Sequence, residues 1–279
     1  MPSPALNEST FEKAVAAERA GWAAPAPDTL SPWTPASPPP PPVDSPSMRV
    51  GGVASACGVM LAILSVTGWV GWQAVEVATG RNVAGDTVVV DTHIPAWLML
   101  GWVVGLVLAI VTILKPNLAR ITAPLYAAAQ GLLVGGISHI YEVQFDGIVL
   151  QAIGLTVGIF LIMLTLFATG RIKVTEKLRM GIIASTGAIF LVYMVSIVLR
   201  IFGADIPFIH DAGPVGIIFS LLVVGIASMN LLLDFDLVEK GVAMKAPRAM
   251  EWYAAFALFV TLIWLYLELL RLLGKLRSR

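Results

Sequence analysis

Residues 214–241 have the sequence PVGIIFSLLVVGIASMNLLLDFDLVEKG. The first twenty of them, 214–233, contain no charged residue, and about 20 apolar residues is the length of a helix that crosses a hydrocarbon core roughly 30 Å thick. Two carboxylates, Asp234 and Asp236, follow directly. An ionised acid at the bilayer centre costs about 2.5–3.5 kcal/mol, so acids at such positions face protein or water and often mark an ion or proton path. The stretch predicts a membrane-spanning helix with a candidate functional acid near its end.

The composition of the whole chain indicates an integral membrane protein. Of its 279 residues, 57% are hydrophobic and only 13% are charged, and the mean hydropathy is +0.84, whereas soluble domains are about half apolar and a quarter charged. The formal net charge is zero, which gives no indication of nucleic-acid binding. A single cysteine, Cys57, excludes an internal disulfide and is expected to be a small buried apolar residue.

Seven apolar runs of about 20 residues predict an all-α fold, a bundle of seven transmembrane helices. The runs are long and continuous, unlike the alternating strands of a membrane barrel, and backbone polar groups in lipid must be satisfied within each segment. The expected spans are 50–75, 95–114, 121–141, 147–168, 179–202, 214–233 and 252–273.

Residues 1–47 form a separate compositional region, so we divide the chain into a tail, 1–47, and a membrane domain, 48–279. The tail contains APAPDTLSPWTPASPPPPPVDSPS at residues 24–47, which is too poor in apolar residues to form a core and favours extended polyproline conformations. We expect it to be a disordered cytoplasmic spacer, within which Glu8–Ala20 is compatible with a short helix.

The distribution of basic residues predicts a cytoplasmic N-terminus, because cytoplasmic loops are enriched in Lys and Arg. The loops expected inside hold Lys115, Arg120, Arg171, Lys173, Lys177, Arg179, Lys240, Lys245 and Arg248. The opposite loops hold Arg81 with the acids Glu76, Asp86, Asp91, Glu142, Asp146, Asp205 and Asp211. The basic end of the chain, Arg271–Arg279, departs from this pattern if the last helix crosses fully; we adopt a full crossing, with a re-entrant last element as the alternative.

Pairs of glycines four residues apart predict close contacts between helices. They occur in GWVVG (residues 101–105), GLLVG (131–135) and GLTVG (154–158). Packing within the bundle is the preferred interpretation, and dimerisation is the alternative.

Asp234 is the first candidate for a functional acid. Asn230 lies one turn earlier on the same face, whereas Asp236 is rotated by about 200° around the helix. The alternative is that both acids only end the sixth helix at the membrane interface.

The last span supplies a second polar set. Thr261 and Glu268 fall on one stripe, and Glu268 with Arg271 forms an i, i+3 ion pair that is either functional or a structural clasp. His139 and Glu142 also share a helix face, as a proton-responsive pair or as solvated interfacial residues.

The search for catalytic motifs favours no enzyme and no cofactor. There is no phosphate-binding glycine loop with its lysine, no HExxH and no other strong metal-ligand spacing in the sequence.

The sequence resembles the Bax inhibitor-1-like family of membrane proteins, especially its bacterial branch, over residues 48–274. The similarity is carried by LYAAAQGLLVGGISHIYE (125–142), IVLQAIGLTVGIFLIMLTLF (148–167), the stretch 216–241 and AAFALFVTLIWLYLELLRLLG (254–274). The resemblance implies a seven-helix bundle with a central last helix and a pH-sensitive calcium leak. It assigns Asp234, the first residue of Asp234–Phe235–Asp236, to a carboxylate pair whose shared proton closes the pore.

The resemblance leaves the second carboxylate open. The family has an aspartate thirteen residues before the glycine that ends LLRLLG, and this position is Thr261 here. Glu268 or Asp236 is then the candidate partner. A basic latch at the start of the third helix corresponds to Arg120, with Lys115 as a less secure match.

Our leading hypothesis from the sequence is a pH-sensitive, calcium-permeable leak of the bacterial cytoplasmic membrane, with Asp234 as sensor and metal ligand. Calcium is expected as the permeant ion and the lipid bilayer as the main partner. The alternative is a non-transporting regulator or adaptor of membrane proteases or stress responses that binds a partner through its Pro-rich tail.

Overall fold

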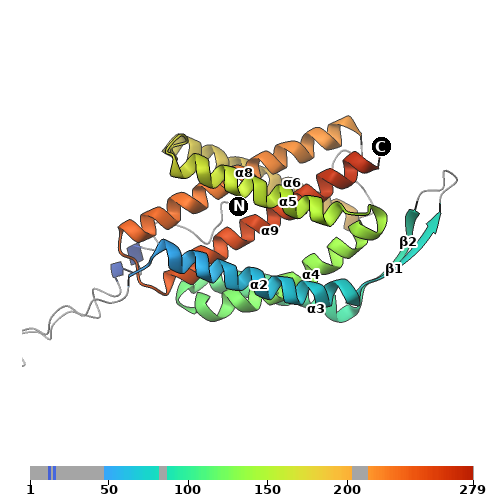
Figure 1. The fold of residues 1–279 in the computed structure, drawn as a ribbon, viewed down its shortest axis with the longest axis horizontal. Helices are drawn as coiled ribbons and strands as arrows, with labels where there is room; N and C mark the ends of the chain where they lie inside the picture. Colours follow the sequence, from blue (N-terminus) through green and yellow to red (C-terminus); the bar gives the residue numbers. More distant parts are fainter. Residues whose placement is uncertain (1–11, 14, 17–46, 82–86, 203–212, 279) are drawn as a thin grey trace, which may run out of the picture.

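The computed structural model describes residues 12–13, 15–16, 47–81, 87–202 and 213–278 (Figure 1). The order of elements in these parts is α2 (Val50–Ala74), β1 (Glu76–Arg81), β2 (Thr87–His93), α3 (Ala96–Leu114), η2 (Pro116–Leu118), α4 (Ala119–Gln144), α5 (Ile148–Ala168), α6 (Glu176–Ile201), α8 (Pro214–Ala243) and α9 (Met250–Arg277). Seven of these helical segments are long and apolar enough to cross a membrane, which confirms the predicted fold class.

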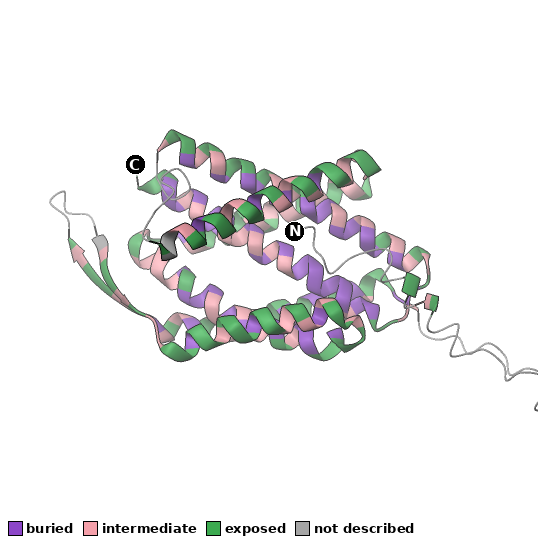
Figure 2. Ribbon diagram, turned by 180° about the vertical axis from the view of Figure 1, so that it is seen from behind, coloured by how far each residue is buried: buried purple, intermediate pink, exposed green. Residues whose placement is uncertain are grey.

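The last helix, α9, lies in the middle of the bundle (Figure 1). It packs against α2, α4, α5 and α8, and its large side chains Tyr253, Phe256, Phe259 and Leu265 are almost completely buried. Figure 2 shows the same contrast, because the outer helices are green on their lipid-facing sides while α9 is largely purple. The central position expected for the last helix is confirmed.

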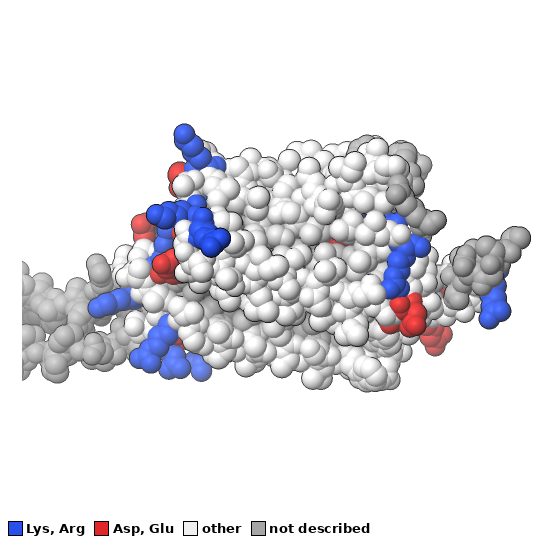
Figure 3. All heavy atoms as spheres, turned by 45° about the horizontal axis from the view of Figure 1, so that its top comes forward, with Lys and Arg blue, Asp and Glu red and all other residues white. Residues whose placement is uncertain are grey.

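Charged side chains gather at the two ends of the bundle, with an uncharged band between them (Figure 3). We call the end at Val50, η2, Arg171 and the α8–α9 loop the basic end, and the opposite end, at β1 and β2, the hairpin end. The helix α9 runs unbroken for 28 residues, about 42 Å at 1.5 Å per residue, from the basic end to the hairpin end. This length favours the full crossing over a re-entrant element.

The two last spans are longer than the sequence analysis expected. The helix α8 continues to Ala243 instead of ending at residue 233, so the interpretation of Asp234 and Asp236 as helix-ending acids is wrong. Asp234 lies nine residues before the end of α8, about 14 Å inside it.

Glycines bring α2 and α4 into backbone contact. A Cβ at Gly135 would lie 2.6 Å from the carbonyl carbon of Gly68, and one at Gly131 would lie 2.6 Å from the carbonyl oxygen of Leu64. The GLLVG pair therefore packs within the bundle, as predicted. GWVVG packs only at ordinary distances, and GLTVG at residues 154–158 meets nothing within 4 Å, so packing was the wrong interpretation for that pair.

A two-stranded antiparallel hairpin, β1 and β2, projects from the bundle between α2 and α3 (Figure 1). The sequence analysis expected only a loop there. The register runs from Glu76 opposite His93 to Arg81 opposite Thr87, with an irregularity between Ala78 and Thr79. The β-branched residues of both strands favour this pairing.

The segment that leads into α2 is fixed to the loop between α8 and α9 and to the first turn of α9. The Met48 amide donates to the carbonyl of Ala246 at 2.8 Å, and the Arg49 amide donates to Glu251 Oε1 at 3.0 Å. Most of the predicted disordered tail lies outside the described residues. Residues 12–13 and 15–16 are helical, and Val15 packs against the core.

Candidate functional site

Asp234 is buried between α8 and α9, with only 1% of its surface exposed. The hydroxyl of Thr261, on α9, hydrogen-bonds its carboxyl group, whereas Oδ2 is buried and has no hydrogen-bond partner among the described residues. Cys57, on α2, lies within electrostatic range of this acid. The structure therefore joins the two residues that the resemblance aligned with a carboxylate pair, but only one of them is an acid.

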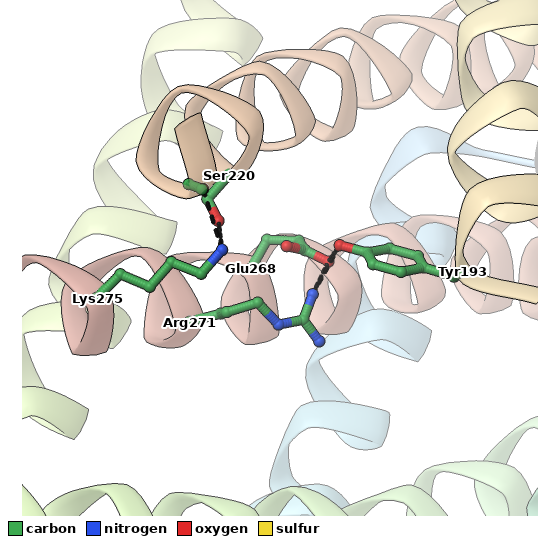
Figure 4. Close-up of polar contacts among 6 residues, drawn as sticks. Tyr193, Ser220, Glu268, Arg271 and Lys275 are labelled. Carbon is green, nitrogen blue, oxygen red and sulfur yellow. Dashed lines mark hydrogen bonds and ion pairs between the residues drawn. The ribbon is translucent and has the colours of Figure 1, made fainter. Parts of the chain in front are cut away.

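Glu268 does not serve as the second carboxylate in this conformation. Its Oε1 accepts hydrogen bonds from the Tyr193 hydroxyl at 2.9 Å and from Arg271 Nη1 at 2.7 Å. Arg271 Nη1 also donates to the Tyr193 hydroxyl at 2.7 Å, and its guanidinium lies over the Tyr193 ring. Figure 4 shows this group tying α9 to α6, and Glu268 is 2% exposed.

Asp236 lies on another face of α8, as its rotation around the helix predicted. It pairs with Lys240 at 3.2 Å, and 14% of its side chain is exposed. Because its charge is compensated by a neighbour one turn away, this acid differs from Asp234 in both partner and exposure.

Lys275 extends the polar contacts toward the hairpin end. Its ammonium group donates to Ser220 Oγ at 2.9 Å and to the carbonyl of Gly216 at 3.0 Å (Figure 4). Fourteen residues separate Ser220 from Asp234 on α8, and fourteen separate Thr261 from Lys275 on α9. One antiparallel register therefore holds over about 21 Å.

The sequence analysis missed three participants, Tyr193, Ser220 and Lys275, and the register shows which signal could have found the last two. Thr261, Glu268 and Lys275 are spaced by seven residues, as are Ser220 and Asp234 with Ala227 between them. Residues spaced by seven along a helix face the same packed neighbour. A search seven residues beyond Glu268, on the stripe that begins at Thr261, would therefore have found Lys275. Tyr193 had no such signal, because its position opposite Glu268 depends on how α6 packs.

The remaining predicted neighbours have other partners. Asn230 donates to Thr186 Oγ1, at 2.8 Å, and not to Asp234. Glu142 accepts the amides of Gly147 and Val149 at the start of α5, at 2.7 and 2.9 Å.

His139, the other member of the expected pair, stacks edge-on against Trp72. The proton-responsive pair expected from His139 and Glu142 is therefore not formed, because Glu142 caps a helix instead.

The predicted latch is absent from this conformation. Arg120 lies at the start of α4 with an exposed side chain, and it forms no ion pair with any described residue. Lys115 is exposed as well. Among the described residues, neither Arg120 nor Lys115 forms a hydrogen bond or ion pair with Asp234.

A resident metal ion does not fit the surroundings of Asp234. In the described part of the chain, no three His, Cys, Asp or Glu side chains are grouped closely enough to hold a metal. The Asp234 carboxyl and the Thr261 hydroxyl offer three oxygens, whereas calcium takes six to eight.

Comparison with known proteins agrees with this architecture. A family profile described as Bax inhibitor 1 like matches residues 3–278. The chain belongs to the Bax inhibitor 1-like family. The match covers nearly the whole Bax inhibitor 1-like chain and extends into the Pro-rich region, which the sequence analysis had placed outside the resemblance. No curated protein and no solved structure matches it.

Proposed function

We propose that this Bax inhibitor 1-like protein is a proton-modulated cation leak of the bacterial cytoplasmic membrane, with calcium as the expected permeant ion. The observation that carries the proposal is the buried carboxyl group of Asp234, which lies about 14 Å inside α8 and has one oxygen with no hydrogen-bond partner in the described part of the chain. Buried carboxylates without a cationic partner are costly, and such acids in membrane proteins are usually functional.

The proposed gate is the α8–α9 contact at Asp234 and Thr261. A neutral Asp234 carries no charge that must be balanced by a partner, so it is compatible with the close packing of the two helices. Loss of its proton places a charge in an apolar bundle, where one hydroxyl is insufficient compensation. Water or a cation must then enter, so we expect the leak to increase as the pH rises.

The experiment is calcium flux into dye-loaded proteoliposomes between pH 6 and 8. Wild-type flux should rise with pH, by at most about tenfold per pH unit for a gate with one proton. Asp234→Asn, which resembles the protonated acid, should give low flux that does not depend on pH.

Asp236→Asn is the matched control, because this acid is two residues away but paired with Lys240. It should keep the wild-type pH profile. An unchanged profile in Asp234→Asn, or an equal loss in Asp236→Asn, would refute the role of Asp234.

Thr261→Asp tests the same contact by shifting the pH dependence of the flux instead of abolishing it. It puts a second carboxyl group beside Asp234, and two adjacent carboxyls share a proton that is released at higher pH. The rise in flux should therefore move toward higher pH. A profile identical to wild type would contradict the proposed contact between these two positions.

A non-transporting adaptor is the second candidate. The bonds of Met48 to the α8–α9 loop and of Arg49 to the first turn of α9 favour it, because they link the Pro-rich region to the helices that carry Asp234 and Thr261. Wild-type vesicles with no flux at any pH between 6 and 8 would support the adaptor over the leak.

A further inference from the structure

A long apolar groove follows α9 between α2 and α5. Its volume is about 1110 Å³, and its walls include residues from Val50 to Trp72 on α2 and from Val149 to Ala168 on α5. Figure 1 shows α9 passing between these two helices. Val50 and Trp72 are 22 residues apart, about 33 Å along the helix, so the groove is as long as the hydrocarbon core is thick.

The wall of the groove offers hydrocarbon contacts. Its hydroxyl groups bond within the protein: Ser65 donates to the Leu61 carbonyl at 2.9 Å, Thr156 donates to the Ala152 carbonyl at 2.7 Å, and the Ser138 and Tyr266 hydroxyls bond each other at 2.6 Å. An occupant therefore gains apolar contact and little hydrogen bonding. Acyl chains fit this chemistry.

The charges near the two ends of the groove are different. At the basic end, the exposed Arg49 directly precedes the wall residue Val50, and the exposed Arg171 follows the wall residue Ala168 by three positions. One acid, Glu239, also lines this end. Trp69 and Trp72 lie toward the hairpin end, where the exposed acid Asp146 precedes the wall residue Val149 by three positions. Among the described residues, the groove wall itself includes no Lys or Arg at either end. The two arginines are placed to attract a phosphate group in the leaflet at the basic end.

We propose that this groove binds an anionic phospholipid, with its acyl chains between α2 and α5 and its phosphate near Arg49 and Arg171. The groove wall includes Cys57, Phe235 and Leu258, and Cys57 is near Asp234, so the lipid covers the helices around the buried acid. The binding does not depend on whether the protein conducts ions.

Two matched leucine substitutions test the position of the acyl chains. Gly58, on α2, is a wall residue, and a Cβ there meets nothing within 4 Å. Gly58→Leu should therefore fill the groove without a clash. Gly154, on α5, is equally open but is not a wall residue, so Gly154→Leu is the control.

The measurement is native mass spectrometry of the full chain in detergent with phosphatidylglycerol or phosphatidylcholine of the same chain length. Wild type and Gly154→Leu should retain phosphatidylglycerol, and Gly58→Leu should lose it. Arg171→Gln should weaken phosphatidylglycerol binding about fivefold, the effect of one basic residue near a lipid surface, without changing phosphatidylcholine binding.

Photo-crosslinking of the wild type avoids any folding defect in the variants. Phosphatidylglycerol with a diazirine in its acyl chain should label peptides from α2 and α5 that contain groove residues. Equal lipid retention by the two leucine variants, labelling confined to other helices, or equal binding of both lipids by wild type would overturn the proposal. So would a dimer that only Gly58→Leu disrupts, because the groove would then be an interface between two copies.

Discussion

Replacement of Gly71 by alanine would force α2 and α4 apart. A Cβ at this position would lie 2.7 Å from the carbonyl carbon of Leu132 and 2.8 Å from its Cα. Carbon atoms in good contact are about 3.5–4.0 Å apart, so the helices must separate locally by roughly 1 Å. Because the obstacle is backbone, no side-chain rotation relieves the clash.

Two opposing effects determine the size of the change. Overpacking of this kind costs about 1–3 kcal/mol, while alanine is favoured over glycine in a helix by up to about 1 kcal/mol. We expect Gly71→Ala to lower the free energy of unfolding by about 1–2 kcal/mol. Gly58→Ala, on the same helix, gains the helix preference without a clash, so it should be neutral or slightly stabilising.

The assay is equilibrium unfolding in mixed micelles of mild detergent and dodecyl sulfate, followed by tryptophan fluorescence. Comparing the free energies of unfolding of the two alanine variants removes the effect that an extra methyl group has at any position of a membrane helix. Equal free energies of unfolding for Gly71→Ala and Gly58→Ala would refute the backbone contact between α2 and α4.

Two further predictions concern polar contacts. Glu142→Ala removes the acceptor for two backbone N–H groups at the start of α5 and should lower the free energy of unfolding by about 1 kcal/mol, with faster hydrogen exchange at those amides; Glu176→Ala, whose side chain is 76% exposed in a 4.0 Å pair, is the control and should change little. Tyr193→Phe removes the hydroxyl between Glu268 and Arg271 and should lower the free energy of unfolding in the same micelle assay by about 1–2 kcal/mol. Wild-type stability in either Glu142→Ala or Tyr193→Phe would contradict the bonds assigned to that residue.

Hydropathy predicted the seven helices because each apolar run is long enough to satisfy its backbone in lipid. It placed the end of α8 at residue 233 instead of Ala243, because an acid lowers the hydropathy of an apolar run. The helix continues there because Asp234 meets Thr261 from α9 and Asp236 meets Lys240 one turn later. The packing of neighbouring helices determines which residue pairs with a buried acid, and the sequence of a single helix carries no information about that packing.

The packing of other helices also explains which polar pairs were predicted correctly and which were not. Spacing of three or four residues correctly placed Glu268 beside Arg271, a contact within one helix. It failed for His139 with Glu142 and for Asn230 with Asp234, where a neighbouring helix offered another partner. Pairs within one helix can be predicted from sequence. Contacts between helices can be predicted only where a seven-residue repeat shows which face of the helix is packed.

The proposed gate at Asp234 and Thr261 is part of a longer contact between α8 and α9. Asp234–Thr261 and Ser220–Lys275 are separated by the same number of residues on both helices, so they belong to one continuous seam about 21 Å long. A slide of one helical turn, about 5.4 Å, would break both contacts together. Glu268 and Arg271, midway along the seam, bind α6 and not α8. In the proposed gate, a charge at Asp234 would therefore act on the whole α8–α9 interface. Because α6 is bonded to α9 through Tyr193 and to α8 through Thr186, a slide of α8 along α9 would also have to break one of these contacts with α6.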